Sequence, residues 1–511
     1  MQDWSEGYTT DVAYTYGYYP ELNPLRSRMA LLASSIAYPE VRTACELGFG
    51  QGVSVNMHAA ASTTEWHATD FNPSHAGFAR QLAGGSPLAE RLRDESFEEF
   101  CRRANLPDFD FIGLHGIWSW ISDSNRHVIA DFLKRKLKVG GVLYISYNTQ
   151  PGWAAIAPIR DLLTGFDEVM TAPGTDRSKR IEAALDFADK LLANGALYGA
   201  ANPIAAGHMK TLREQNRNYL AHEYFNRDWT PMPFAHMAEW MTSAKLQFAG
   251  SAYFTDRIPA LHLSTTQRDM LSGIPDTCFR ETTRDFMVNQ RFRRDYWVRG
   301  ARRLSRLEQT ERMRDQRMVL AVPAGQVELK VSGAVGEATM QEDVYKPILE
   351  VFSDHEVHTL GEIERAVERH GIRLSQIQQA ALVLTGTGAL HPAQDEHVVH
   401  AARSATKALN TRLFQSARHS DIAYLASPVT GGAINVGRFE QLFLLARSQG
   451  MTTPGEWARY ASDLLAAQEQ RVIKDGKAVD SVERQLDELT RQAMRTAQVT
   501  LPVMSHLGIL D

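Results

Sequence analysis

The sequence predicts an α/β protein whose first domain is built around an open, mainly parallel sheet. From residue 41 onward, short apolar segments alternate with amphipathic segments, which is typical of βαβ units. A glycine-rich stretch at residues 46–52 stands where the first apolar segment gives way to the first helical one. After Trp153 this alternation is lost and the chain becomes rich in Ala and Leu. The first domain is therefore expected to be followed by helical structure.

The parallel strands are expected in five apolar segments, with helices such as Ser124–Lys138 in the intervals. These segments are Arg42–Leu47, Glu65–Asp70, Leu92–Phe97, Phe109–Leu114 and Val142–Tyr147. Residues 138–141, with two glycines, predict the turn before the fifth strand.

Residues 156–219 predict a helical insertion in this domain. The helix Pro233–Ala244 and the strands Leu246–Phe254 and Arg291–Val298 then complete the sheet. The first domain is expected to comprise residues 1–155 and 220–300, because a chain can leave a domain and re-enter it.

The remainder of the chain is expected to be mainly helical. Residues 301–400 predict a linker helix and a winged-helix-like domain, with three short helices followed by an extended segment at 388–392. Residues 374–381 contain no Arg or Lys, so the helix that would read DNA lacks the usual phosphate contacts. Residues 401–511 predict a helical domain for interaction or regulation, and a homodimer through these helices is one possibility.

Composition narrows the class of protein. A chain of 511 residues is too long for one core, so two to four domains are expected. The net charge of −5 argues against a dedicated nucleic-acid binder. Cys45, Cys101 and Cys278 are too widely spaced for a disulfide framework or a metal site, and they suit a reducing cytoplasm. No signal-like segment or long apolar stretch predicts export or membrane insertion.

The most informative motif is Glu46-Leu-Gly48-Phe-Gly50-Gln-Gly52. Glycines at a turn from strand to helix let the backbone approach a ligand closely. A dinucleotide fingerprint would require glycine at position 53, where this chain has Val. The alternative is a tight turn without a ligand, because glycines also serve turns.

Asp70 ends the second predicted strand. A carboxylate at this position can accept hydrogen bonds from the ribose hydroxyls of a nucleotide. It could also cap the helix that begins at Pro73. Phe71 and Asn72 are expected to line the same pocket, because ligands bind at the carboxyl ends of parallel strands.

The E-x-G-x-G-x-G pattern resembles motif I of class I S-adenosylmethionine-dependent methyltransferases. The resemblance implies S-adenosylmethionine as cofactor, with the loop beside its methionine part and Glu46 holding its ammonium group. It also implies that Ser96 and Phe97 meet the adenine ring, although a Phe at a strand end is often a core residue.

A narrower resemblance extends over the chain to about residue 300. It rests on the segments Tyr14–Pro24, Phe109–Ser122, Tyr147–Trp153 and Tyr219–Phe225. These segments resemble those of bacterial methyltransferases with a methyltransferase regulatory domain, a group that includes rickettsial-type protein-lysine methyltransferases. This implies a Rossmann-like methyltransferase domain with a helical insertion and a regulatory region. It also implies a protein lysine as acceptor. A small molecule or a glycan is the alternative acceptor, and a non-catalytic cofactor-sensing adaptor is a second alternative.

The acceptor side is expected beyond the fourth strand. His115 is either a base or a histidine that orients the loop. Trp118 and Trp120 follow it, with core packing favoured for at least one of them. An acceptor wall is expected from Tyr147, Asn148, Trp153, Tyr219, His222, Glu223 and Tyr224, although such residues often only pack.

The N-terminal aromatic segment could close over the cofactor. Tyr18, Tyr19 and Pro20 form either a lid or a packed arm. The candidate catalytic residues are His115, Trp118, Tyr219 and His222. The candidate cofactor-binding residues are Tyr18, Glu46, Gly48, Gly50, Gly52, Asp70, Phe71, Asn72, Ser96, Phe97 and His115.

Overall fold

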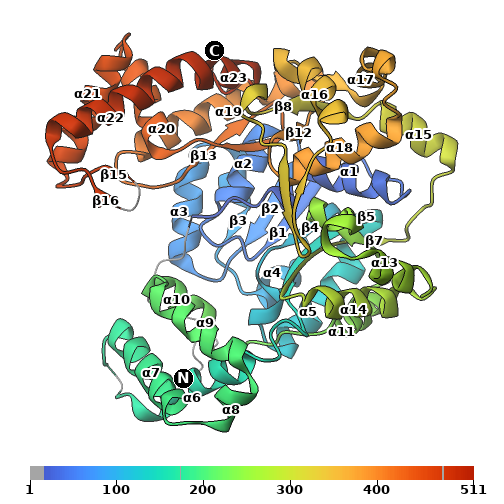
Figure 1. Cartoon of the computed structure of the whole chain (residues 1–511), viewed down its shortest axis with the longest axis vertical. Helices are drawn as coiled ribbons and strands as arrows, with labels where there is room; N and C mark the ends of the chain where they lie inside the picture. Colours follow the sequence, from blue (N-terminus) through green and yellow to red (C-terminus); the bar gives the residue numbers. More distant parts are fainter. Residues whose placement is uncertain (1–15, 173, 475–476, 511) are drawn as a thin grey trace.

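The computed structural model describes residues 16–172, 174–474 and 477–510. The first fifteen residues of the predicted first domain therefore lie outside the described part, as do two residues of the Tyr14–Pro24 segment. A central sheet lies between the C-terminal helices and a separate group of helices at the other end of the molecule (Figure 1).

The sheet has seven strands in the order β3-β2-β1-β4-β5-β7-β6. The first five pair in parallel, and β7 pairs antiparallel with β5 and with β6. This confirms the predicted mainly parallel sheet, and residues 43–69 form strand, helix and strand as expected. The strands are β1 Thr43–Leu47, β2 Glu65–Thr69, β3 Leu92–Arg93, β4 Phe109–Leu114, β5 Leu137–Asn148, β6 Leu246–Ser251 and β7 Phe292–Arg299.

Strand β5 differs from the prediction because it begins five residues earlier. Residues 138–141 were expected to form a turn, yet they remain in the strand as an irregularity in its pairing with β4. Gly140 takes a φ of +81° there, a conformation that glycine adopts without steric cost. The glycines therefore serve a bulge within the strand.

Helices cover both faces of the sheet because alternate strand residues point to opposite sides. Ala44, Phe111 and Tyr144 pack in one core cluster with residues of α1 (Pro24–Ala33), α2 (Val53–Ala61) and α3 (Pro73–Ala83). Cys45 and Ile112 pack on the other face with α4 (Phe97–Cys101), α5 (Asp123–Lys136) and α11 (Phe234–Ser243). This layering brings the carboxyl ends of β1, β2 and β4 together at one edge.

The helical insertion follows β5 and has a core of its own. It consists of α6 (Ala157–Met170), α7 (Arg177–Ala193), α8 (Leu197–Ala201), α9 (Pro203–Glu214) and α10 (Arg217–Tyr224). Its apolar cluster includes Ile159, Leu185 and Leu220, and it extends to Tyr224 and Phe225, beyond residue 219 where the insertion was expected to end.

After the insertion the chain re-enters the sheet. The connecting helices are α12 (Pro259–His262), α13 (Thr265–Ser272) and α14 (Thr277–Val288).

The part after residue 300 contains the three short helices expected of the winged-helix-like region, together with a small sheet that was not predicted. The helices are α16 (Glu342–Val351), α17 (Leu360–Ala366) and α18 (Leu374–Gly386). A three-stranded antiparallel sheet joins β8 (Arg317–Leu320) to β11 (His358–Thr359) and β12 (Leu390–Pro392). Helix α15 (Arg306–Arg314) precedes them, and a hairpin pairs β9 (Lys330–Gly333) with β10 (Gly336–Thr339).

The C-terminal region packs against the first domain (Figure 1). Thr406 donates a hydrogen bond to the Ala60 carbonyl, and Arg412 donates to the Leu82 and Ala83 carbonyls. A dimer through these helices stays a prediction. The elements are α19 (Glu396–Ser416), β13 (Tyr424–Ser427), β14 (Gly432–Asn435), α20 (Arg438–Ser448), α21 (Pro454–Ala467), β15 (Ile473–Lys474), β16 (Lys477–Ala478), α22 (Val482–Arg495) and α23 (Leu501–His506).

Among the helices of the described residues, none combines the length and apolar character needed to cross a membrane.

Candidate functional site

The glycine loop connects β1 to α2 in a conformation that requires glycine. Gly48, Gly50 and Gly52 have φ values of +76°, +56° and +70°, a region that side chains disfavour. A Cβ at Gly48 would collide with Ile117, and one at Gly52 would lie 2.5 Å from the Cβ of Ala79. The three glycines therefore allow close packing of the loop and keep its backbone accessible to a ligand.

Asp70 ties this loop to the end of β2. One carboxylate oxygen accepts from the Gly50 amide at 2.8 Å, and the other accepts from the Asn72 amide at 3.0 Å and lies 3.2 Å from His75 Nδ1. A carboxylate can accept about four hydrogen bonds, so Asp70 keeps room for one more donor, such as a ribose hydroxyl. The helix cap expected of Asp70 is supplied instead by Asn72, whose side chain accepts from the Ser74 amide at 2.9 Å.

Glu46 lies beside Asp70 at the end of β1. Its side chain is buried, and within the described part of the chain its Oε2 has no hydrogen-bond partner. Burial, and then the charge of Asp70, raise the pKa of Glu46 well above the ordinary carboxyl value. A buried carboxyl next to a second carboxylate is stabilised by a cation. The ammonium group of S-adenosylmethionine fits this position.

This arrangement gives a pH-dependent expectation for cofactor binding. If the ammonium pairs with ionised Glu46 as predicted, binding requires that ionisation, which in a group with a raised pKa is completed only well above pH 4.5. Affinity for S-adenosylmethionine should therefore increase as pH rises above this ordinary value, with proton release on binding. Calorimetry in buffers of different ionisation enthalpy measures that release, and Glu46→Gln should abolish it. Equal proton release by both proteins would contradict the assignment.

His115 follows β4 within an aromatic group. Its ring stacks on Tyr19 with centroids 3.5 Å apart, and its Nδ1 lies 2.8 Å from the Tyr144 hydroxyl. Burial, and then the charge of Arg294, lower the pKa of His115 to about 3. His115 is therefore neutral near pH 7, but a group with so low a pKa accepts a proton only weakly, which favours the orienting role over that of a base.

Two predicted adenine contacts have clear structural tasks. Ser96 caps α4 in a reciprocal pair with Glu99: its hydroxyl accepts from the Glu99 amide at 3.3 Å, and its own amide donates to the Glu99 carboxylate. Strand β3 ends at Arg93, so Phe97 begins a helix and packs partly buried against the core. Phe71, half-buried after β2, stays a predicted cofactor contact.

Two other predicted residues pack away from the His115 group. The Trp118 side chain is fully buried in the core, and its indole nitrogen donates to the sulfur of Met232 at 3.4 Å. Tyr18 is also buried, and its hydroxyl accepts from the Ala433 amide at 2.9 Å. The N-terminal segment is thus a packed arm at Tyr18, whereas Tyr19 reaches His115.

A series of aromatic contacts joins the sheet domain to the insertion. The ring centroid of Trp229 lies 6.2 Å from that of Trp120 and 5.1 Å from that of Trp153. The ring centroids of Trp153 and Tyr224 are 6.3 Å apart. The structure thus brings together Trp153 and Tyr224 of the expected acceptor wall. The wall's other members on α10 are the half-exposed Tyr219, the buried His222 and the partly buried Glu223.

Sequence reasoning missed three residues of this region. Trp229 stands in a polar loop, and its buried indole nitrogen has no hydrogen-bond partner among the described residues. Tyr144 contacts His115 from the middle of an apolar strand, where a hydroxyl signals a need for a partner. Arg294 on β7 pairs with the buried Glu21 at 3.3 Å, and no local pattern marks it because the two are far apart in sequence.

Comparisons with known proteins agree with this fold. Residues 216–299 match the family described as a predicted methyltransferase regulatory domain. The uncharacterised protein sll1526 of Synechocystis is 40% identical over 512 residues, which cover 99% of each chain. An uncharacterised protein of Rickettsia prowazekii, RP789, is 28% identical over 36% of this chain and 33% of its own length.

Among solved structures, PKMT2 from Rickettsia typhi in complex with AdoHcy matches 97% of this chain and 99% of its own, with a TM-score of 0.67 and 17% identity. That similarity extends through the insertion and the C-terminal region, so the whole architecture is shared. The chain belongs to the class I S-adenosylmethionine-dependent methyltransferases that carry a methyltransferase regulatory domain.

Proposed function

We propose that this enzyme transfers a methyl group from S-adenosylmethionine to the side-chain amine of a protein lysine. The observation that carries the cofactor part is the buried carboxyl oxygen of Glu46 beside the glycine loop, for which the described residues supply no hydrogen-bond partner. The similarity to PKMT2 over nearly the whole chain supports a protein acceptor.

Glu46, the glycine loop and Asp70 would hold the cofactor, which when bound supplies an activated methyl carbon. The chain's own task is to align a neutral amine and keep water away. The ordinary pKa of lysine is about 10.4, so desolvation or a base must provide the neutral form. Burial raises the pKa of Glu223 on α10 to about 7, so this carboxyl suits proton exchange with an incoming ammonium.

The aromatic series suits the same acceptor. The Arg160 guanidinium already lies over the Trp229 ring, 5.1 Å from its centroid, and the neighbouring Trp153 ring is the one that could attract a cationic amine and its methylated product. These rings lie where the insertion meets the sheet domain. We place the activity in the cytoplasm, since all three cysteines are free, as is usual in a reducing compartment.

The acceptor class can be tested by intact-mass measurement. The full chain is incubated with S-adenosylmethionine and candidate proteins, each before and after chemical blocking of its lysine amines. A methyl-sized mass gain only on unblocked proteins supports the proposal. Transfer that persists after blocking, or transfer only to small molecules or glycans, would exclude lysine as the acceptor.

His115→Ala is expected to lower kcat about tenfold while changing cofactor affinity less. The substitution removes the ring that contacts Tyr19 and Tyr144, so it disturbs alignment, and a loss of about 1.4 kcal/mol corresponds to a factor of ten. Single-turnover rates and calorimetry separate the two effects. Because His115 is neutral above about pH 3, His115→Asn should leave the pH profile between 5 and 8 unchanged in shape. An unaltered rate for both variants would remove His115 from the site.

A further inference from the structure

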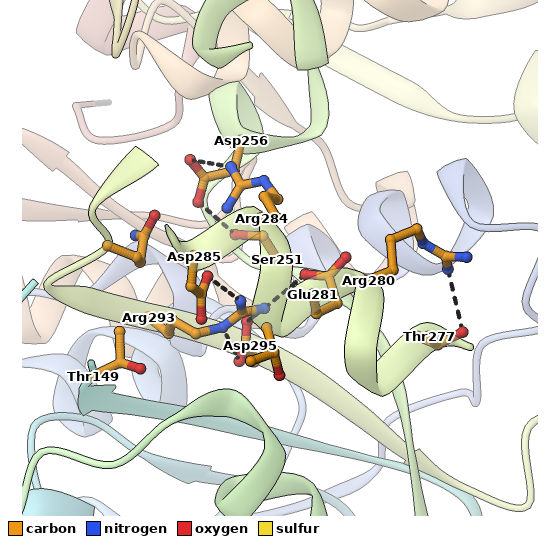
Figure 2. Close-up of polar contacts among 12 residues, drawn as sticks. Thr149, Ser251, Asp256, Thr277, Arg280, Glu281, Arg284, Asp285, Arg293 and Asp295 are labelled. Carbon is orange, nitrogen blue, oxygen red and sulfur yellow. Dashed lines mark hydrogen bonds and ion pairs between the residues drawn. The ribbon is translucent and has the colours of Figure 1, made fainter. Parts of the chain in front are cut away.

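A cavity of about 360 Å³ lies between β6, α13 and α14, within the segment matched as a regulatory domain. Its volume falls in the range of small-molecule sites. Arg280, Glu281 and Arg284 lie on α14, with Asp256 opposite Arg284 (Figure 2). The other charged residues in its wall are Arg257 and Arg268.

The arginines of this cavity outnumber the carboxylates, and both carboxylates are already engaged. Glu281 is held at 2.9 Å by Arg293, which does not line the cavity, and Asp256 pairs with Arg284 at 3.3 Å. Arg268 donates only to the hydroxyl of Thr265 among its hydrogen bonds in the described chain. The cavity therefore retains excess positive charge.

Arg280 and Arg257 likewise donate to neutral oxygens. Arg280 donates to the Ile274 carbonyl at 3.1 Å and to the Thr277 hydroxyl at 3.2 Å. Arg257 donates to the Ser251 carbonyl at 2.6 Å and to the Ser34 hydroxyl at 2.9 Å. Its remaining nitrogen, Nη2, is buried and has no acceptor within the described residues.

The Arg257 guanidinium can lie against β6 because residue 250 is glycine. A Cβ on Gly250 would lie 2.6 Å from Arg257 Nη2, and Gly250 has a φ of +125° that other residues rarely adopt. Burial lowers the pKa of Arg257 to about 10, which indicates incomplete compensation of its charge. A buried N–H group that lacks a hydrogen-bond acceptor costs free energy. An anionic oxygen would supply the acceptor that Arg257 Nη2 lacks.

We propose that this cavity binds a small organic anion that carries a phosphate or carboxylate group on an apolar body. Arg257, Arg268 and Arg280 receive the oxyanion. Phe248, Leu263 and Leu271 in the wall provide apolar contact for the body.

A second cavity of about 350 Å³ gives the ligand room to extend. It shares Arg257, Pro259 and Arg268 with the first and is also bounded by residues of α18. Those residues include Ser375, Gln378 and Gln379, whose side chains can hydrogen-bond to a polar end of the ligand. The helix that carries no Arg or Lys for DNA thus contributes neutral polar groups to this site.

Calorimetry on the full chain tests the site with phenyl phosphate, benzoate and phenol. At least one anion should bind more tightly than phenol, and the tighter anion identifies phosphate or carboxylate as the preferred group. Arg268→Gln should weaken anion binding about tenfold, equivalent to about 1.4 kcal/mol, because it removes a charge-assisted contact to the anion. Arg268 is exposed, so its replacement leaves the core intact.

Arg306→Gln on α15 is the matched control, because Arg306 is also exposed and lies outside both cavities. It should leave anion affinity unchanged. Three results would overturn the proposal. Phenol could bind as tightly as both anions, the two variants could lose anion affinity equally, or neither anion could bind. S-adenosylmethionine affinity should be the same in all three proteins, so failure here is distinguishable from failure of the proposed methyl transfer.

Discussion

Replacing Asp70 by alanine is expected to weaken S-adenosylmethionine binding about 100-fold, equivalent to about 2.7 kcal/mol. The side chain holds the Gly50 and Asn72 amides and approaches His75, and each hydrogen bond to a charged group contributes about 1.5–3 kcal/mol. The substitution should therefore loosen the glycine loop and also remove the contact that we predict with the ribose of the cofactor. Calorimetry with S-adenosylmethionine measures the loss.

The matched control is Asp94→Ala. Asp94 lies on the same side of the sheet but is exposed, and it pairs with Arg80 at 2.7 Å. An exposed ion pair contributes at most about 1 kcal/mol, so cofactor affinity should not change measurably. Unchanged affinity in Asp70→Ala would show that the ribose is held elsewhere.

Arg293→Met is expected to lower the free energy of unfolding by about 3–5 kcal/mol, as is usual when one partner of a buried ion pair is removed. Arg293 is buried between Asp285 at 2.6 Å and Asp295 at 2.9 Å, and it also contacts Glu281 (Figure 2). Methionine would leave these carboxylates close together without a cation. The free energy of unfolding in urea is compared with that of the control variant Arg291→Met. Arg291 is exposed just before β7, so its replacement should change the free energy of unfolding only slightly.

The defect in Arg293→Met should grow with pH. Burial already raises the pKa of Asp285 to about 7 in the presence of Arg293. A carboxyl whose pKa is higher in the folded than in the unfolded state releases protons on unfolding. The free energy of unfolding therefore falls as pH rises from the unfolded-state pKa to the folded-state pKa. The variant should therefore lose more stability at pH 8 than at pH 5. Adding Asp285→Asn should restore part of the loss, whereas a pH-independent defect would show that the lost contact is one of packing alone.

Local pattern was sufficient to predict the sheet and the glycine loop. The strands β1 and β4 are mainly apolar segments buried on both faces, and such segments are characteristic of parallel sheets. Gly48, Gly50 and Gly52 have positive φ values that glycine adopts without steric cost. Strand β5 was predicted too short because a glycine pair marks a bulge and a turn equally well.

The sequence by itself determined the elements, the class of fold and the E-x-G-x-G-x-G loop, because these depend on periodicity and on backbone conformations local to a few residues. Only the tertiary structure decided which groups meet. It placed Trp118 and Tyr18 in packed cores, made His115 neutral by burial, and left a carboxyl oxygen of Glu46 without a hydrogen-bond partner among the residues that the structure describes. Burial and charge compensation depend on side chains brought together from distant strands and helices, and no spacing along the chain encodes them.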